Sequence, residues 1–427
     1  MTDFRADVYQ NEFMPEGSTD VNAIVTIAAT GAGGAAARVA SGTSAAEVIV
    51  IDCSGSMEGV KLREAKRATS AAIDAIDDGV LFAVVAGSDG ATVLYPRSGA
   101  LAVATGASRS EAKESVATLS ARGGTHIGTW LSTAQTLFAQ APGALAHAIL
   151  LTDGRIEGET IQHFEQALAG CSGLFQCDCR GVGTDWEVSE LRKIAQTLLG
   201  SVDIVAQPEN LVSDFESLMG EAMSKGVANV VLRIWAPQGA ELLFVKQVAP
   251  ALDELTAKAT VVNPLTKDFP LGNWGNESRD YHVCMRVVPG GVGSEKLAAR
   301  ASLVVDDQVV SQGLIRAVWT DDSALSTKIN PQVAHYTGQA ELAQAIQEGL
   351  EARKSGDDEQ ATKKLGRAVQ LAAESGNDAT MKLLAKVVEV EDPERGTVRL
   401  KRQVDLADEM ALDTRSTKTV RTRKVGE

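Results

Sequence analysis

Short apolar segments alternate with segments of helical period between residues 45 and 225. The run Glu-Val-Ile-Val-Ile-Asp at 47–52 is followed by residues 61–76, whose apolar side chains recur at helical spacing. This alternation predicts a doubly wound α/β unit, in which helices cover both faces of a mainly parallel sheet. Since ligands of such sheets bind at the carboxyl ends of strands, Asp52 and Asp153 are expected in one crevice. Further strands are expected at 80–86, 91–95, 146–152, 175–182 and 202–205, and further helices at 110–119, 129–138, 160–168, 188–199 and 211–222.

The sequence on either side of this unit has a different pattern. Short alternating strands separated by turn residues fill 226–325 and predict an antiparallel β-sandwich. An apolar strand within residues 1–44 has no partner in a doubly wound sheet. We therefore expect it to join the sandwich, with the α/β unit of 45–225 inserted between the two parts. Helical hairpins are expected at 335–391, and the polar segment 392–427 is expected to be disordered.

Composition limits the classes of partner and the compartment. The 427 residues carry a formal net charge of −15, so the phosphates of nucleic acids and anionic membranes should repel the chain. No apolar run is long enough to span a bilayer, and the polar N-terminus has no signal-peptide pattern. The five cysteines match no zinc pattern and predict buried thiols in a reduced, cytoplasmic protein.

Three loops carry the residues with the strongest chemical signal. Asp52, Ser54 and Ser56 follow one strand, Thr125 lies in a Gly-Gly-Thr sequence between two helical segments, and Asp153 follows another strand. Each loop alone is also typical of a turn or a helix cap. Together they supply only hard oxygen donors, two carboxylates and three hydroxyls, which suit Mg²⁺, Mn²⁺ or Ca²⁺. With so few carboxylates, we expect at least one coordination position to stay open to an outside ligand.

The order and approximate spacing of these loops resemble the metal-ion-dependent adhesion site of von Willebrand factor A domains. The sequences Asp-x-Ser-x-Ser, Gly-Gly-Thr and Thr-Asp-Gly match all five signature positions, and the resemblance covers about residues 45–225. It implies one bound divalent ion whose coordination is completed by an Asp or Glu of a protein partner. It also implies three hydroxyl ligands and two acidic positions that ligate the ion or hold its waters: Ser54, Ser56, Thr125, Asp52 and Asp153.

These features favour a metal-dependent protein-interaction module or scaffold over an enzyme. The similarity to intracellular bacterial relatives implies a role in a cytoplasmic signalling or stress system. One alternative is a metal-dependent hydrolase with His126 as its candidate base, although no Walker loop or Ser-His-Asp set accompanies the site. Another is a subunit that serves a separate ATPase.

The C-terminal segment 414–424 suggests a second binding function. Basic residues surround four threonines there, and an unstructured segment of this kind is a plausible substrate for a Ser/Thr kinase. Each phosphate would add a charge of about −1.5 to −2 and present a group that a phosphothreonine-binding domain could recognise. A solvated end without function is the alternative interpretation. The candidate threonines are Thr414, Thr417, Thr419 and Thr422.

Overall fold

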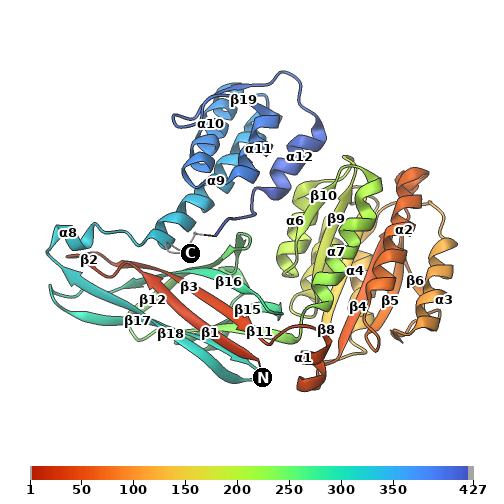
Figure 1. Ribbon diagram of the computed structural model, residues 1–427, viewed down its shortest axis with the longest axis horizontal. Coiled ribbons are helices and arrows are strands. Elements are labelled where there is room, and N and C mark those ends of the chain that lie inside the picture. The colour runs from red at the N-terminus through yellow and green to blue at the C-terminus, as the bar shows by residue number, and fades with distance from the viewer. Residues whose placement is uncertain (1, 422–427) are drawn as a thin grey trace. The chain divides into compact units, whose positions relative to one another are not determined.

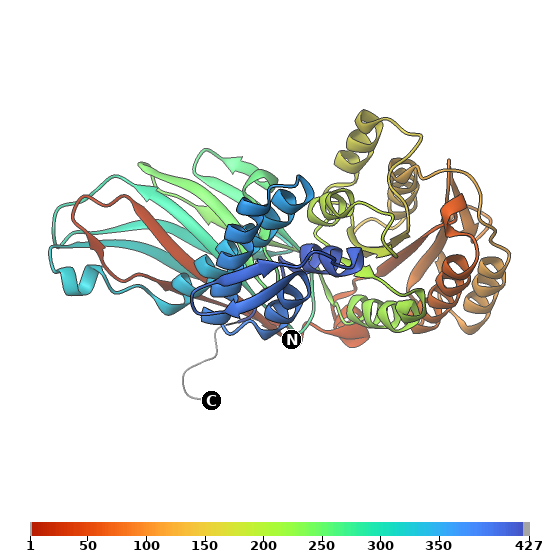
Figure 2. The ribbon, with the colours of Figure 1, turned by 90° about the horizontal axis from the view of Figure 1, so that it is seen from above.

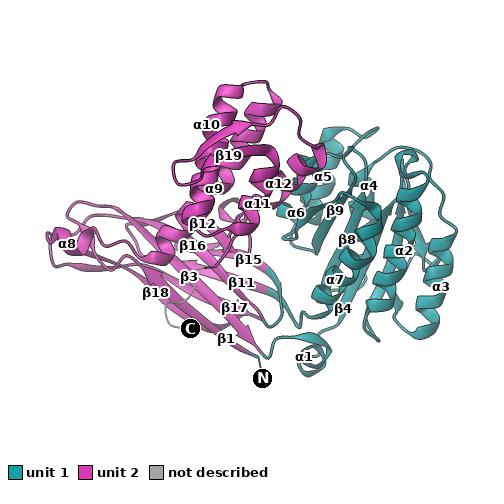
Figure 3. Ribbon diagram, turned by 45° about the horizontal axis from the view of Figure 1, so that its top comes forward, with its two compact units in different colours: residues 1–2, 31–229, 272–276 teal, residues 3–30, 230–271, 277–427 magenta. Residues whose placement is uncertain are grey.

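The computed structural model describes residues 2–421, and its contacts divide the chain into two compact units. Residues 31–229 form most of the first unit, drawn teal in Figure 3, and the second combines 3–30 and 230–271 with the chain from 277 onward. This division confirms the predicted fold class, an α/β unit inserted in a β-sandwich and followed by helices.

The first unit contains a seven-stranded sheet in the order β10-β9-β8-β4-β5-β6, with β7 also paired to β5. Strands β10 to β5 are parallel, and β6 and β7 run antiparallel to β5 (Figure 1). Every residue of the central strand β4 is buried, which explains its continuous apolar run. The strands are β4 (Ala45–Asp52), β5 (Leu81–Gly87), β6 (Ala91–Tyr95), β7 (Ala102–Val103), β8 (Leu145–Thr152), β9 (Gln176–Val182) and β10 (Val202–Val205).

Helices cover both faces of this sheet. Helices α2, α3 and α7 bury their apolar sides against one face, in a core that includes Ile49 and Ile149. Helices α4 and α6 contact strands of the sheet, and α5 packs on α4. The bounds are α1 (Gly34–Ser41), η1 (Gly55–Met57), α2 (Val60–Ala75), α3 (Gly106–Ala117), α4 (Ile127–Phe138), α5 (Ile161–Cys171), α6 (Val188–Thr197), η2 (Pro208–Asn210) and α7 (Leu211–Met223).

The boundary between the N-terminal part of the sandwich and the α/β unit differs from the predicted one, because helix α1 belongs to the α/β unit. Residues 31–44 were expected in the sandwich, but they belong to the first unit. The cause is Arg38, a buried side chain whose Nη1 donates to the carbonyl oxygens of Met223 and Lys225 at 2.7 and 2.9 Å. These bonds fix α1 beside the end of α7.

The second unit contains two sheets, in the orders β1-β3-β16-β12-β13 and β14-β15-β11-β17-β18-β2. The N-terminal strand β3 pairs antiparallel with β16, and its residue Ala23 lies opposite Val283. The strands are β1 (Asp3–Gln10), β2 (Met14–Pro15), β3 (Asp20–Thr30), β11 (Val227–Trp235), β12 (Ala240–Ala249), β13 (Asp253–Glu254), β14 (Thr260–Asn263), β15 (Thr266–Trp274), β16 (Ser278–Val287), β17 (Glu295–Val305) and β18 (Gln308–Thr320). A short 3₁₀ helix, η3 (Thr256–Lys258), follows β13.

The longer C-terminal helices α9, α10 and α11 share one apolar core in the second unit and are drawn in blue in Figure 2, whereas the short helix α8 contacts β2 and β18. Asp357 and Asn377 cap α10 and α11, since each side chain accepts from a backbone N–H three residues later, at 3.0 and 3.1 Å. Gly356 and Gly376 precede them with positive φ, as the predicted helix stops require. The helices are α8 (Ser323–Ser326), α9 (Pro331–Lys354), α10 (Asp358–Glu374) and α11 (Asp378–Val387).

The prediction of a disordered segment at 392–427 is wrong for the part that the structure describes. Strands β19 (Val388–Asp392) and β20 (Thr397–Leu400) form a hairpin, and helix α12 (Leu406–Arg415) follows it. The physical reason is Leu412, which is fully buried in a core shared with α9, α10 and α11. Beyond α12, the backbone N–H of Leu252 donates to the carbonyl of Thr417 at 2.8 Å, which ties the tail to the sandwich.

Between residues 2 and 421, no helix is both long enough and apolar enough to cross a membrane.

Candidate metal site

Two carboxylates lie at the carboxyl ends of adjacent strands, as the sequence predicts. Asp52 ends β4, and Asp153 directly follows β8, its neighbour in the sheet. Both are fully buried. Asp52 accepts from the backbone N–H of Ser54 at 2.7 Å and from the hydroxyl of Thr152 at 2.6 Å. Burial raises the pKa of Asp52 to about 6, although these hydrogen bonds act in the opposite direction.

The second predicted loop is hydrogen-bonded to the first. The backbone N–H of Gly55 donates to the carbonyl of Gly123 at 2.9 Å, and that of Arg122 donates to the carbonyl of Cys53 at 2.8 Å. Gly123 has a φ of +77°, and a Cβ there would lie 2.5 Å from a carboxylate oxygen of Asp89. The glycine is therefore required both for the turn and for the close approach of Asp89.

The hydroxyls and the carboxylate of Asp153 converge at one point. The Ser54 and Ser56 hydroxyl oxygens lie 3.0 Å apart, and Ser56 donates to Oδ1 of Asp153 at 2.6 Å. A Cβ placed on Gly154 would lie 3.0 Å from Oγ1 of Thr125 and 3.7 Å from Oγ of Ser56. The structure thus brings all three loops together at the carboxyl edge of the sheet.

This donor set fits a hard divalent ion. Two carboxylates and three hydroxyls provide only oxygen atoms, as Mg²⁺ and Mn²⁺ prefer, and a glycine beside Thr125 keeps the approach open. Within the described part of the chain, no group of three or more His, Cys, Asp or Glu residues is arranged to hold a metal. Lys61 adds one basic group, because its Nζ donates to Oδ2 of Asp153 at 2.6 Å.

Two tryptophans pack at the same edge of the sheet. The indole of Trp130 covers Gly87, where a Cβ would lie 2.4 Å from a ring carbon, and the indole of Trp186 covers Gly181 at 1.9 Å. The ring N–H groups donate to backbone carbonyls of Ser88 and Gly183. These contacts hold the ends of β5 and β9 that flank the site.

A cavity of about 300 Å³ is lined by residues that follow the first loop and precede the second in the chain. It lies between the start of α2 and the segment before Gly123, so it is next to the proposed ligands in the chain. Arg63 and Lys66 contribute basic groups, and Leu62 an apolar one. The lining residues are Glu58, Gly59, Leu62, Arg63, Lys66, Ser120 and Ala121.

Comparison with known proteins establishes the family. A family model described as the von Willebrand factor type A domain matches residues 46–204, and one described as the von Willebrand factor type A C-terminal domain matches 370–416. A solved structure described as von Willebrand factor type A from Catenulispora acidiphila is 50% identical, with a TM-score of 0.93 over 98% of this chain and 97% of that one. The chain belongs to the von Willebrand factor type A (VWA) family.

More distant relatives support the fold of the VWA unit and its flanking parts. The ArnB paralog VWA2 from Sulfolobus acidocaldarius is 14% identical with a TM-score of 0.62, and the match covers 99% of this chain and 100% of that one. That likeness concerns the fold alone. An uncharacterized protein from Synechocystis is 28% identical over 53% of this chain, and the match spans half (50%) of its own length.

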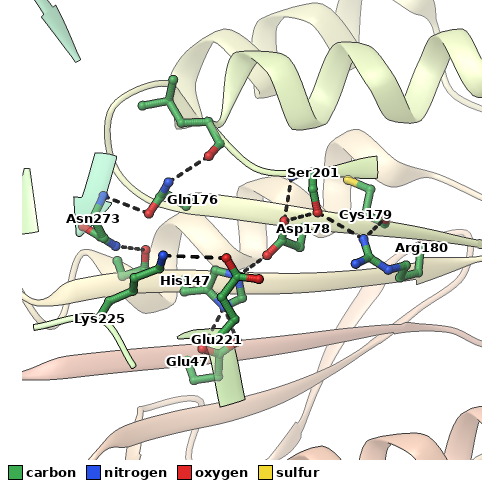
Figure 4. Close-up of polar contacts among 12 residues, drawn as sticks. Glu47, His147, Gln176, Asp178, Cys179, Arg180, Ser201, Glu221, Lys225 and Asn273 are labelled. Carbon is green, nitrogen blue, oxygen red and sulfur yellow. Dashed lines mark hydrogen bonds and ion pairs between the residues drawn. The ribbon is translucent and has the colours of Figure 1, made fainter. Parts of the chain in front are cut away.

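A buried charged cluster at the opposite edge of the VWA sheet was not found from the sequence (Figure 4). His147 lies between two carboxylates at the amino ends of three adjacent strands. Its Nδ1 is 2.9 Å from both carboxylate oxygens of Glu47, and its Nε2 is 2.9 Å from Oδ2 of Asp178. Asp178 also accepts from the backbone N–H and the hydroxyl of Ser201, each at 2.6 Å.

The pKa values in this cluster follow from burial and charge. Burial alone would lower the pKa of His147, but the charge of Glu47 and hydrogen bonds to both carboxylates outweigh it and raise the pKa to about 10. Burial raises the pKa of Glu47. Burial also acts to raise the pKa of Asp178, but the hydrogen bond and charge of His147 lower it below its usual range.

Proposed function

We propose that this protein is a metal-dependent interaction module. It holds one divalent ion, Mg²⁺ or Mn²⁺ in preference to Ca²⁺, through the hydroxyls of Ser54, Ser56 and Thr125. Asp52 and Asp153 act as acidic ligands or as acceptors for the waters of the ion. An Asp or Glu of a partner protein fills the open position.

One observation carries this proposal, the convergence of three loops on Gly154. Ser56 Oγ and Thr125 Oγ1 lie 3.7 and 3.0 Å from the same point beside this glycine, and Ser56 also bonds to Asp153. The donors come from residues far apart in the sequence, and no helix cap needs such an arrangement. The remaining protein donors are neutral hydroxyls, so an oxygen ligand from outside, such as a partner's carboxylate, would complete the coordination of the ion.

The cavity beside the loops supports an acidic partner segment. The whole chain carries −15, yet Arg63 and Lys66 line the cavity together with Glu58. The carboxylate of Glu64 pairs with Arg63 at 3.2 Å and offsets part of this positive charge. A partner segment whose first acidic residue binds the ion would find a positive surface for its next residues. Charge complementarity of this kind favours an acidic peptide over a basic one.

We propose no catalytic role for the site. His126 was the candidate base of the hydrolase alternative, and its Nε2 lies against Gly158, 2.3 Å from where a Cβ would stand. The imidazole is thus used in packing the loop after β8. The subunit of an ATPase-driven complex is a special case of the interaction module, because it differs only in the partner.

The proposal also covers the C-terminal tail and the cellular compartment. For the tail, fewer threonines remain candidates for phosphorylation than the sequence suggested. Thr414 is buried in α12 and donates to the carbonyl of Met410 at 2.9 Å, so a kinase could not reach it in the folded protein. Thr419 donates to the carbonyl of Val248 at 2.7 Å. Thr417 is therefore the candidate for a Ser/Thr kinase and a phosphothreonine-binding partner, and Thr422 lies outside the described residues. We propose a bacterial cytoplasmic setting.

The test is capture of partners by the immobilised full-length protein from a native cell lysate. Proteins are retained in about 5–10 mM Mg²⁺, a concentration above the dissociation constants of about 10⁻⁴–10⁻³ M of weak metal sites. These proteins should elute with EDTA. The variant Ser54→Ala/Ser56→Ala removes two ligands without changing charge and should retain none of them. Identical retention by the variant and the wild type would refute the proposed function.

A further inference from the structure

Lys61 occupies an unusual position beside the candidate metal site. It is the second residue of α2, and its ammonium lies between two carboxylates from different loops. Its Nζ is 2.6 Å from Oδ2 of Asp153 and 3.2 Å from Oδ2 of Asp185. The side chain of Asp153 is 0% exposed, whereas that of Asp185 is 72% exposed. The ammonium of Lys61 therefore contacts both a buried carboxylate and a solvent-exposed one.

The two oxygens of Asp153 have different partners. Oδ1 accepts from Ser56, a proposed ligand, and Oδ2 accepts from Lys61. A buried carboxylate without a cation is strongly disfavoured, because nothing replaces its lost hydration. In a protein without a bound ion, Lys61 is the positive group in contact with this carboxylate.

The backbone holds the lysine in place. Gly59, with a φ of +86°, begins the helix that carries Lys61. The lysine stem passes close to Gly183, where a Cβ would lie 3.6 Å from Cε of Lys61. Gly183 has a φ of +69° and begins the loop after β9, so the stem lies between two turns that each contain a glycine of positive φ. The position of the ammonium is thus built into the fold and is not a chance surface contact.

We propose that Lys61 is the built-in counter-cation of the metal site, and that it sets the concentration of divalent ion at which the site fills. Without an ion, Lys61 neutralises Asp153 and keeps the three loops assembled. An incoming ion meets the repulsion of this ammonium, and Asp185 offers the ammonium a second carboxylate away from the ion. This inference rests on the proposed metal site and adds a threshold concentration of divalent ion, below which the site stays empty.

The consequence for function is that partner capture responds to the free concentration of the ion. In the metal-free protein the three loops are assembled, and Lys61 neutralises part of the negative charge of the site. The site therefore stays empty at a low concentration of the ion, and the loops do not need to refold when the ion binds. A partner's acid then binds only above the threshold, because it needs the ion and not the ammonium. Removing the ammonium should lower the ion concentration at which the site fills, and it should also lower the stability of the metal-free protein. The metal-bound state is thus favoured and the metal-free state disfavoured.

The test compares Lys61→Met with Lys61→Arg and with Lys113→Met in the full-length protein. Methionine keeps the aliphatic stem without charge, and arginine keeps the charge. Lys113 is the matched control, since its Nζ donates to a carboxylate, that of Asp74, at the same distance of 2.6 Å, but this pair is not part of the candidate metal site. Mn²⁺ affinity is measured by calorimetric titration, and the melting temperature is measured in EDTA and in saturating Mn²⁺.

We expect Lys61→Met to bind Mn²⁺ about tenfold more tightly, as follows from removing one positive charge a few ångströms from a 2+ ion in a solvated site. Its melting temperature in EDTA should fall, and Mn²⁺ should restore it by more than in the wild type. Lys61→Arg should lie close to the wild type in both measurements, and Lys113→Met should match the wild type in Mn²⁺ affinity and in the rise of melting temperature that Mn²⁺ causes.

Three outcomes would count against the proposal in distinguishable ways. Equal or weaker Mn²⁺ binding by Lys61→Met, with an unchanged melting temperature in EDTA, overturns the counter-cation role and leaves the metal site standing. Absence of Mn²⁺ binding in both the wild type and Lys61→Met overturns the metal site and the inference with it. If Lys61→Met does not fold in EDTA, Lys61→Met/Asp153→Asn should restore folding, and its failure to do so overturns the inference.

Discussion

The charged cluster of Glu47, His147 and Asp178 allows a quantitative prediction about stability. Replacing His147 by leucine removes the cation from between two carboxylates and leaves Glu47, which is 1% exposed, without its partner. Breaking a buried ion pair on one side costs about 3–5 kcal/mol. For a unit of about 200 residues, each kcal/mol lowers the melting temperature by about 2–4 °C, so we expect His147→Leu to lower it by about 6–20 °C.

The double variant Glu47→Leu/His147→Leu is the control for this prediction. It removes His147 together with the more deeply buried of its two carboxylate partners, and Asp178 keeps the two hydrogen bonds from Ser201. Replacing a whole buried pair by apolar residues is often neutral, so the double variant should recover most of the lost stability. Differential scanning calorimetry of the three proteins in EDTA measures these shifts. A cost below about 1 kcal/mol for His147→Leu, or a double variant less stable than the single one, would refute the reasoning.

The same cluster gives a pH dependence with a definite sign. The folded pKa of His147 is about 10, above its unfolded value of about 6.5. Its contribution is therefore complete below pH 6.5 and is lost as the pH rises toward 10. The raised pKa of Glu47 acts in the same direction, because its burial costs more once it ionises. Wild-type stability should decline from pH 6.5 to 10, whereas Glu47→Leu/His147→Leu should lack this decline.

Four further changes have defined outcomes. Ser56→Ala should weaken Mn²⁺ binding in calorimetric titration at least tenfold, because it removes a ligand and a donor to Asp153. Gly181→Ala should lower the free energy of unfolding by about 1–3 kcal/mol and perturb tryptophan fluorescence, since its Cβ would stand 1.9 Å from Trp186. Arg63→Gln should reduce metal-dependent partner capture, while Arg67→Gln, equally exposed and also paired with Glu64, should not. Truncation after Arg415 should speed amide exchange at Leu252, which donates to Thr417.

The proposed ligands were predictable because each follows a strong local pattern. A fully buried strand such as β4 reads as an unbroken apolar run, and the acidic residue that ends it marks the carboxyl edge of the sheet. Short motifs at two such strand ends and in one loop then identified the candidate ligands. This step required no knowledge of which distant segments pack together. The sequence therefore predicted the residues of the candidate metal site, and the structure adds their convergence.

Other features depend on contacts that no local pattern contains. The His147 cluster combines one residue from each of three strands, and adjacent residues in those strands are apolar. Strand β15 was not predicted, because Pro270 and Gly272 interrupt its pattern. Lys61 stands at the start of the predicted helix of 61–76, and its contacts with Asp153 and Asp185 join residues 92 and 124 positions apart. The tail looked disordered, because its few apolar residues, such as Leu412, become significant only when α9 and α11 are placed beside them.

The pairing of β3 with β16 has a consequence for synthesis of the protein. Ala23 lies opposite Val283, so the partner of β3 leaves the ribosome 260 residues later (283 − 23). At about 5–20 residues per second, β3 waits roughly 13–50 s for it. During that time β1 can pair with one edge of β3, but the other edge exposes unpaired backbone groups, which is a hazard for aggregation. The inserted VWA unit is complete in the meantime apart from residues 272–276, so a nascent chain paused near residue 250 should carry a folded VWA unit beside a hairpin that still needs a chaperone.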